Sequence, residues 1–147
     1  MVIDYKKWAL AALLVLAMLI AGYILLWLNQ RQPTARELGS GFNQQVYISI
    51  AEHGLVNFDE ITDFDWDYLV ILGPYTSVAN ALEYMGFSWH RPVTHVQHSD
   101  VQTLLLFVNN NQVVAFTHII RARVDFTAIL REHGNAPINK PAILKFN

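Results

Sequence analysis

The chain has 147 residues, with 10 Lys and Arg against 12 Asp and Glu and a formal net charge of −2. This charge disfavours nucleic acid as the main partner, because phosphate binding requires an excess of Lys and Arg. The length supports one folded domain. The absence of cysteine excludes disulfides, thiolate catalysis and cysteine-ligated zinc.

Residues 8–28 form an apolar run in which only Gly22 falls outside the strongly apolar residue types. As a helix this run would be about 32 Å long, which matches a hydrocarbon core of about 30 Å. It is longer than the apolar region of a signal peptide, and no small-residue cleavage site follows it. We therefore predict an uncleaved transmembrane helix that contacts the lipid bilayer through residues 8–28.

Lys6 and Lys7 flank the N-terminal end of this run and favour a cytoplasmic N-terminus. The predicted location is the bacterial inner membrane, crossed once, with the C-terminal part periplasmic or otherwise extracytoplasmic. The predicted organisation is a tail at 1–7, an anchor at 8–28, a linker at 29–34 and a folded domain at 35–147.

The domain opens on a capping-box pattern, Thr34 to Glu37, which predicts a helix beginning near Ala35. Phe42, Val46 and Ile50 recur every four residues and extend this helix to the glycine at position 54. The same stretch also alternates in a way that suits a strand, but its length and the terminal glycine favour a helix.

The remaining elements follow from local patterns. Strands are predicted at 55–58 and 66–72, and Ser77 or Thr76 can cap a helix that stops at Gly86. Residues 101–108 and 113–120 read as two strands joined by an asparagine-rich hairpin turn. A short helix after Asp125 and an edge strand at 142–146 complete the chain. The predicted fold is α+β, a single N-terminal transmembrane helix followed by a small antiparallel sheet packed on two or three helices.

Acidic residues concentrate between positions 59 and 67. Their spacing resembles a calcium loop, but Tyr68 and Pro74 stand where that loop requires Gly and Glu. In extended chain the acids would lie on one face and the aromatic residues on the other. Two interpretations stay open, an acidic turn before a buried Trp66, or a patch that binds a basic protein. The predicted partner-binding residues are Asp59, Glu60, Asp63, Asp65, Asp67, Tyr68 and Tyr75.

Histidines form a second cluster, His90, His95 and His98 with Asp100. Their spacing does not match the usual zinc arrangements, so we expect a solvated loop and no metal site. His118 is expected to be a half-buried sheet residue. No nucleophile motif, phosphate loop or dinucleotide fingerprint is present, which predicts no enzyme activity and no cofactor.

Thr62 to Asp67 carries a T-x-F-x-W-D pattern, Gly73 to Ser77 carries G-P-Y-T, and Leu106 to Val108 lies within an L-x-F-V hairpin. This pattern resembles small bacterial secreted or membrane-anchored α+β domains over roughly residues 42–126. Some domains of this kind look like immunity proteins that neutralise interbacterial toxins. The resemblance implies a protein-binding role without catalysis.

The leading hypothesis is therefore a membrane-anchored domain that binds a protein partner, such as a basic toxin that it occludes in the periplasm. The alternative is a structural or accessory subunit of an envelope assembly that uses its transmembrane helix for packing. Ala9, Ala12 and Gly22 would allow close helix approach.

Overall fold

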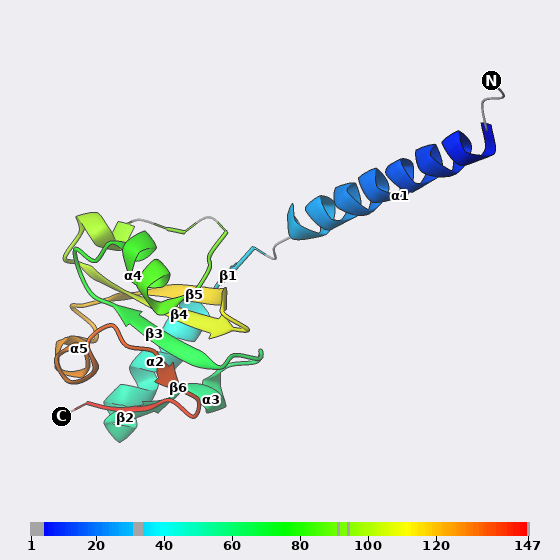
Figure 1. Cartoon of the computed structure of the whole chain (residues 1–147). Coiled ribbons are helices and arrows are strands. Elements are labelled where there is room, and N and C mark those ends of the chain that lie inside the picture. Colours follow the sequence, from blue (N-terminus) through cyan, green and yellow to red (C-terminus); the bar gives the residue numbers. More distant parts are fainter. Residues whose placement is uncertain (1–4, 31–33, 91, 94, 147) are drawn as a thin grey trace. The chain divides into compact units, whose positions relative to one another are not determined.

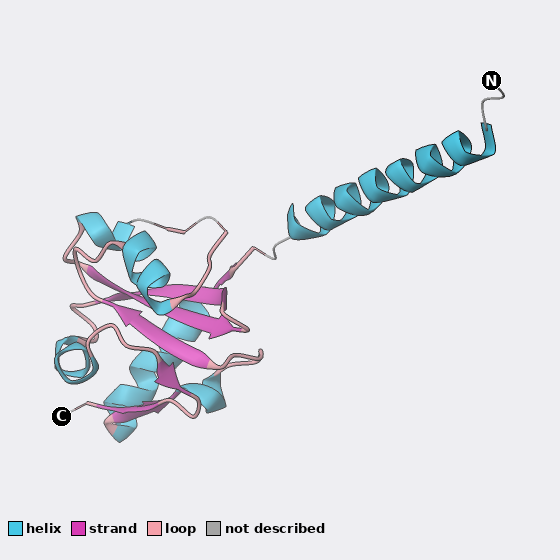
Figure 2. Cartoon of the chain, viewed as in Figure 1, coloured by secondary structure: helices cyan, strands magenta, loops and turns pink. Residues whose placement is uncertain are grey.

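A computed structural model describes residues 5–30, 34–90, 92–93 and 95–146, and within 5–30 it describes the side chains of residue 9 and residues 12–27. The chain divides into two compact units, Met1–Pro33 and Thr34–Asn147. The first contains α1 (Tyr5–Gln30), and the second contains every other described element. Figure 1 labels the elements and Figure 2 shows their secondary structure.

The predicted transmembrane helix is contradicted. Across the described part of the chain, no helix combines the length and the apolar character that crossing a membrane requires. The same finding contradicts the prediction of a single-pass protein of the bacterial inner membrane.

The second unit is an α+β fold, as predicted from the sequence. Its helices are α2 (Ser40–His53), α3 (Phe58–Ile61), α4 (Val78–Met85), α5 (Thr127–His133) and a 3-10 turn, η1 (His95–His98). The main sheet has the strand order β1-β5-β4-β3-β6. These strands are β1 (Arg36–Glu37), β3 (Tyr68–Leu72), β4 (Gln102–Asn109), β5 (Gln112–Ile120) and β6 (Ile138–Asn139). A separate antiparallel pair joins β2 (Leu55–Asn57) to β7 (Ile143–Lys145).

The predicted helix start near Ala35 is wrong, and so is a purely antiparallel sheet. Arg36 and Glu37 pair in parallel with Ala115 and Phe116 of β5. Ala35 and Leu38 are buried in different cores, which is the alternation of a strand. The outer edge of β5 is therefore covered, and Asn43 at the start of α2 continues this cover by donating from Nδ2 to the His118 carbonyl at 3.0 Å.

Local signals placed several elements correctly. Ser77 accepts a hydrogen bond from the Asn80 amide at the start of α4, and Gly86 ends that helix at φ 73°. Gly54 ends α2 at φ 66°, and only such a left-handed position favours glycine. Asn110 and Asn111 adopt φ values of 49° and 61° in the predicted hairpin turn.

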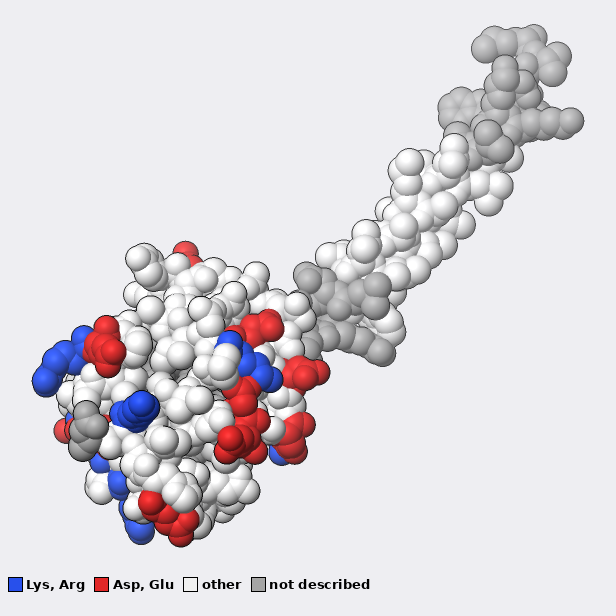
Figure 3. Space-filling view, turned by 90° about the horizontal axis from the view of Figure 1, so that it is seen from below, with Lys and Arg blue, Asp and Glu red and all other residues white. Residues whose placement is uncertain are grey.

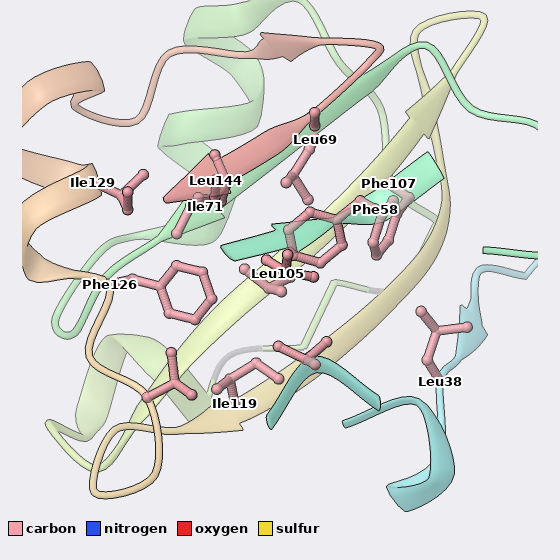
Figure 4. Close-up of a cluster of buried hydrophobic side chains, with 14 of the residues drawn as sticks. Leu38, Phe58, Leu69, Ile71, Leu105, Phe107, Ile119, Phe126, Ile129 and Leu144 are labelled. Carbon is pink, nitrogen blue, oxygen red and sulfur yellow. The ribbon is translucent and has the colours of Figure 1, made fainter. Parts of the chain in front are cut away.

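The sheet separates two cores, and Figure 1 shows α4 on one face and α2 on the other. The first core lies under α2, α3, α5 and the β2–β7 pair, and includes Phe58, Trp66, Leu69, Ile71, Leu105, Phe107, Ile119, Phe126, Ile129 and Leu144. Figure 4 shows most of these side chains converging. The second core lies under α4 and η1 and includes Val70, Leu72, Val78, Leu82, Val96, Leu104, Leu106 and Phe116. The unit is thus a three-layer structure.

Candidate functional site

The acidic segment lies on α3 and on the loop of residues 62–67 that leads to β3, and we call the two together the acidic loop. Asn57 begins it, accepting a hydrogen bond from the Asp59 amide at 3.2 Å and donating to Glu60 Oε1 at 2.8 Å. Thr62 closes the helix, because its hydroxyl donates to the Phe58 carbonyl at 2.8 Å. Both ends of α3 are therefore fixed by side chains.

Trp66 anchors the acidic loop to the sheet. Its side chain is 2% exposed, and its indole N–H donates to Thr62 Oγ1 at 2.9 Å. The Trp66 and Phe64 rings lie 5.5 and 5.4 Å from the Phe107 ring, both edge-on. The burial of Trp66 confirms its interpretation as a core residue. Asp63, Asp65 and Asp67 alternate with these aromatic residues and are exposed, so the acids face solvent although no strand forms here.

Asp59 does not belong to the exposed surface. Its side chain is 20% exposed, and neither carboxylate oxygen is accessible or meets a hydrogen-bond donor with good geometry. Lys140 Nζ lies 3.2 Å from Oδ1 and 5.2 Å from the centroid of the Trp66 ring. The lysine supplies the opposite charge that a buried carboxylate needs. Asp59 therefore ties the C-terminal segment to the acidic loop.

Asp67 also has a structural role. Its carboxylate accepts the Asn110 amide at 2.9 Å, its own amide donates to the Val108 carbonyl at 2.7 Å, and its carbonyl accepts the Lys140 amide at 3.0 Å. The side chain thus supports the asparagine turn between β4 and β5. Its other carboxylate oxygen, Oδ1, makes no hydrogen bond to a described residue and is available to a partner.

Three predicted acids are free to meet a partner. Asp63 forms an exposed ion pair with Arg36 at 3.2 Å, with 74% of the Asp63 side chain and 61% of the Arg36 side chain exposed. Such a pair contributes about 0–1 kcal/mol and exchanges readily. Glu60 is exposed and bonded only to Asn57, and Asp65 is exposed with no described partner. Figure 3 shows acidic side chains gathered on one side of the unit, with basic atoms among them.

The two predicted tyrosines lie away from the acids. Tyr68 is half-buried on the opposite face of the sheet, where its ring lies 5.5 Å from that of Phe87. Tyr75 is 68% exposed but follows the other end of β3, where it adopts φ 60° and donates its amide to the Val96 carbonyl at 2.8 Å. The predicted binding residues therefore do not form one continuous surface.

A hollow of about 370 Å³ lies beside the acidic loop and was not predicted. It is lined by the Arg36–Asp63 pair and by residues of β1, α2 and α3, including Leu38, Phe42, Gln45 and Ile61. The sequence signal that could have indicated it was the alternation at 35–38, because a strand there brings Arg36 next to α3. The hollow gives the acidic surface an apolar floor.

Two histidines, His95 of η1 and His118 of β5, lie on the face of the sheet that α4 covers. Within the described residues, no three His, Asp or Glu side chains are placed to hold a metal ion. His118 is half-buried in β5, as expected from the sequence. Burial lowers its pKa below the ordinary value, Glu37 partly offsets this lowering, and His95 adds a smaller lowering.

A second groove, of about 460 Å³, runs along α4. Thr76, Ser77, Asn80, Ala81, Tyr84 and Met85 line one side, and Asn135, Ala136 and Pro137 line the other. Tyr84 is 93% exposed at its edge. The described lining of this groove contains no charged side chain, so the groove differs in character from the hollow at the acidic loop.

The exposed carboxylates and the adjoining hollow are thus the described features best suited to recognising a charged partner. Comparison with protein-family models, with curated proteins and with solved structures finds no match to this chain.

Proposed function

We propose that the unit Thr34–Asn147 is a protein-binding domain that recognises a basic surface through the acidic loop. The observation that carries the proposal is the rigid display of Glu60, Asp63 and Asp65. These carboxylates project into solvent from a segment that Trp66, Phe64 and the α3 caps hold in place. A preorganised loop loses little conformational entropy on binding.

Charge and shape support the same role. The acidic loop attracts basic surfaces at long range and raises the association rate. In the complex, a Lys or Arg side chain of the partner would occupy the hollow. Its stem would pack on Phe42 and Ile61, and its charge would lie near Asp63. Arg36 is the group that such a side chain would displace from Asp63, at the small cost of an exposed ion pair.

The exposure of these acids favours binding over catalysis. Catalytic carboxylates work best in enclosed sites of low dielectric, where fixed charges are strong. Glu60, Asp63 and Asp65 face water, which weakens their fields, and salt limits their steering of a partner to about one Debye length.

The resemblance to immunity-type domains supports a finer proposal, in which the basic partner is a toxin whose active surface the domain covers. The alternative of an envelope subunit packing through a transmembrane helix depended on that helix and is not retained.

The proposal is tested by affinity capture from the cells that make the protein, followed by mass spectrometry and reconstitution with the purified partner. The test variant is the triple charge reversal Glu60→Lys, Asp63→Lys and Asp65→Lys. The matched control is Glu52→Lys, Glu83→Lys and Glu132→Lys, three exposed acids on α2, α4 and α5 with the same change in net charge.

We expect the loop variant to lose capture at low salt and the control variant to retain it. Both should unfold at similar denaturant concentrations, since exposed substitutions change stability by about 0.5 kcal/mol or less. Equal capture by the two variants would show that the acidic loop is not the binding surface. For the toxin proposal, co-expression with the identified partner should restore growth only with an intact acidic loop.

A further inference from the structure

His118 occupies an unusual position on the second face of the sheet. Its side chain is half-buried, and its Nε2 atom is inaccessible and meets no hydrogen-bond partner among the described residues. The strand beneath it is fixed, because the His118 carbonyl accepts a hydrogen bond from Asn43. The imidazole itself is held by ring contacts, with centroids 5.9 Å from His95 and 5.9 Å from Phe116. A proton on Nε2 would therefore find neither water nor an acceptor.

Two described ionisable groups act on this imidazole, each from a neighbouring element. Glu37 comes from β1 and favours a positive charge on His118, whereas His95 comes from η1 and opposes it. Burial is the largest influence and lowers the pKa of His118. Near pH 7 the ring is therefore neutral, and its contact with His95 carries no repulsion.

Other contacts link η1 to the fold besides the one between His95 and His118. Val96 is fully buried in the second core, and its carbonyl accepts the Tyr75 amide at 2.8 Å. That bond holds Tyr75, an exposed residue in a left-handed conformation immediately before α4. The position of η1 thus determines how the segment before α4 is held.

We propose that the His95–His118 contact is an acid-sensitive clasp, which releases η1 from β5 and frees the Tyr75 segment when His118 becomes protonated. A positive charge on His118 lies in a half-buried site that offers its Nε2 proton no hydrogen bond. Release lets water reach His118 and hydrate this charge.

The direction in which stability depends on pH follows from the lowered pKa of His118. Folding lowers the pKa of His118, so the unfolded chain binds more protons than the folded chain in mildly acidic solution. Stability therefore rises with pH in this range. The stability that neutral His118 contributes is fully present above about pH 6.5, the ordinary pKa of histidine. It is lost as the pH falls towards the lowered pKa of His118.

The experiment compares the full chain at about pH 7.5 and about pH 5.5, a range in which histidine titrates. Amide hydrogen exchange of Tyr75, corrected for intrinsic rates, reports the clasp. Denaturant unfolding reports global stability. The variants are His118→Gln and His95→Gln, with His90→Gln as an exposed control from the same segment.

In the wild type, acidification should increase exchange at Tyr75 and lower stability. His118→Gln and His95→Gln should weaken both responses, and His90→Gln should leave them unchanged. Glu37→Gln should enlarge the response, because it removes the group that favours the charged ring. Tyr75 exchange that does not change with pH, or an equal response in the control and the two clasp variants, would overturn the proposal. If His118→Gln does not fold, the exposed His95 provides the decisive variant.

Discussion

The two faces of the main sheet are closed in different ways. On the first face, the Phe107 ring contacts Phe42, Phe58, Phe64 and Trp66 at centroid distances of 5.4–5.9 Å. These four rings come from α2 and from the acidic loop, so one residue of β4 gathers two parts of the chain.

The second face is closed by less regular structure. Its core is mostly Val and Leu, covered by the eight-residue α4 and by Phe87, Trp89, Val93 and Val96. The Trp89 ring lies 4.9 Å from Phe116, and the backbone bond from Tyr75 to Val96 holds η1. On the two proposals made above, the first face presents a fixed surface for recognition, whereas the second face contains the part of the fold that responds to pH.

The largest expected difference between the faces comes from removing one ring from each. Phe107→Ala should lower the free energy of unfolding by about 3–5 kcal/mol, because the ring is fully buried among four aromatic neighbours. Phe116→Ala should cost less, because Phe116 is 7% exposed and contacts half-buried partners. Denaturant unfolding measures both. A larger loss for Phe116→Ala would contradict the assignment of the first face as the more tightly packed.

The Asp59–Lys140 pair provides a second test of the first face. Lys140→Met should lower the free energy of unfolding by about 1–3 kcal/mol, because it leaves the Asp59 carboxylate without an opposite charge. Adding Asp59→Asn to Lys140→Met should recover part of this loss, since the buried charge is then removed as well. If the double variant is less stable than Lys140→Met alone, the charge of Asp59 is not what Lys140 compensates.

Within the acidic loop, two neighbouring acids should behave differently. Asp67→Ala should lower the free energy of unfolding by about 1 kcal/mol, because it removes the acceptor of the Asn110 amide. Asp65→Ala should change stability by about 0.5 kcal/mol or less, and should slow partner association instead. Unfolding midpoints and association rates for the two variants separate support of the fold from recognition. Equal unfolding midpoints would remove the structural role of Asp67.

The smallest expected effect lies at the start of α5. The Thr127 hydroxyl donates to Asp125 at 2.6 Å, and this bond is the main cause that lowers the pKa of Asp125. Thr127→Val should raise that pKa towards the usual range, as carboxyl NMR can measure. The interactions that lower this pKa stabilise the fold above about pH 4, and this stabilisation is lost on further acidification. Arg121→Gln should raise the pKa less, because Arg121 contributes less than Thr127.

Local sequence signals predicted what local physics determines. Ser77 and Gly86 bounded α4, and the asparagine run gave the hairpin turn, because caps and left-handed turns depend on a few adjacent residues. The capping box at Thr34–Glu37 failed for the opposite reason. Pairing of Arg36 and Glu37 with β5, distant in sequence, outweighs a local preference of about 1 kcal/mol.

The candidate site shows the same limit. The alternation of acids with Phe64 and Trp66 was readable from the sequence, and the structure places those aromatic side chains inward. The neutralisation of Asp59 by Lys140 and the Arg36–Asp63 pair were not readable, because they join residues brought together only by folding. The placement of Tyr68 and Tyr75 away from the acids also depends on which sheet face and which strand end each occupies.

The most direct test of the acidic loop as a recognition surface is the association rate constant with the captured partner, measured by stopped flow across ionic strengths. For the wild type, the rate should fall steeply with salt. The Glu60→Lys, Asp63→Lys and Asp65→Lys variant should associate at least about tenfold more slowly at low salt and lose this dependence. A variant whose rate and salt dependence both match those of the wild type would contradict the account.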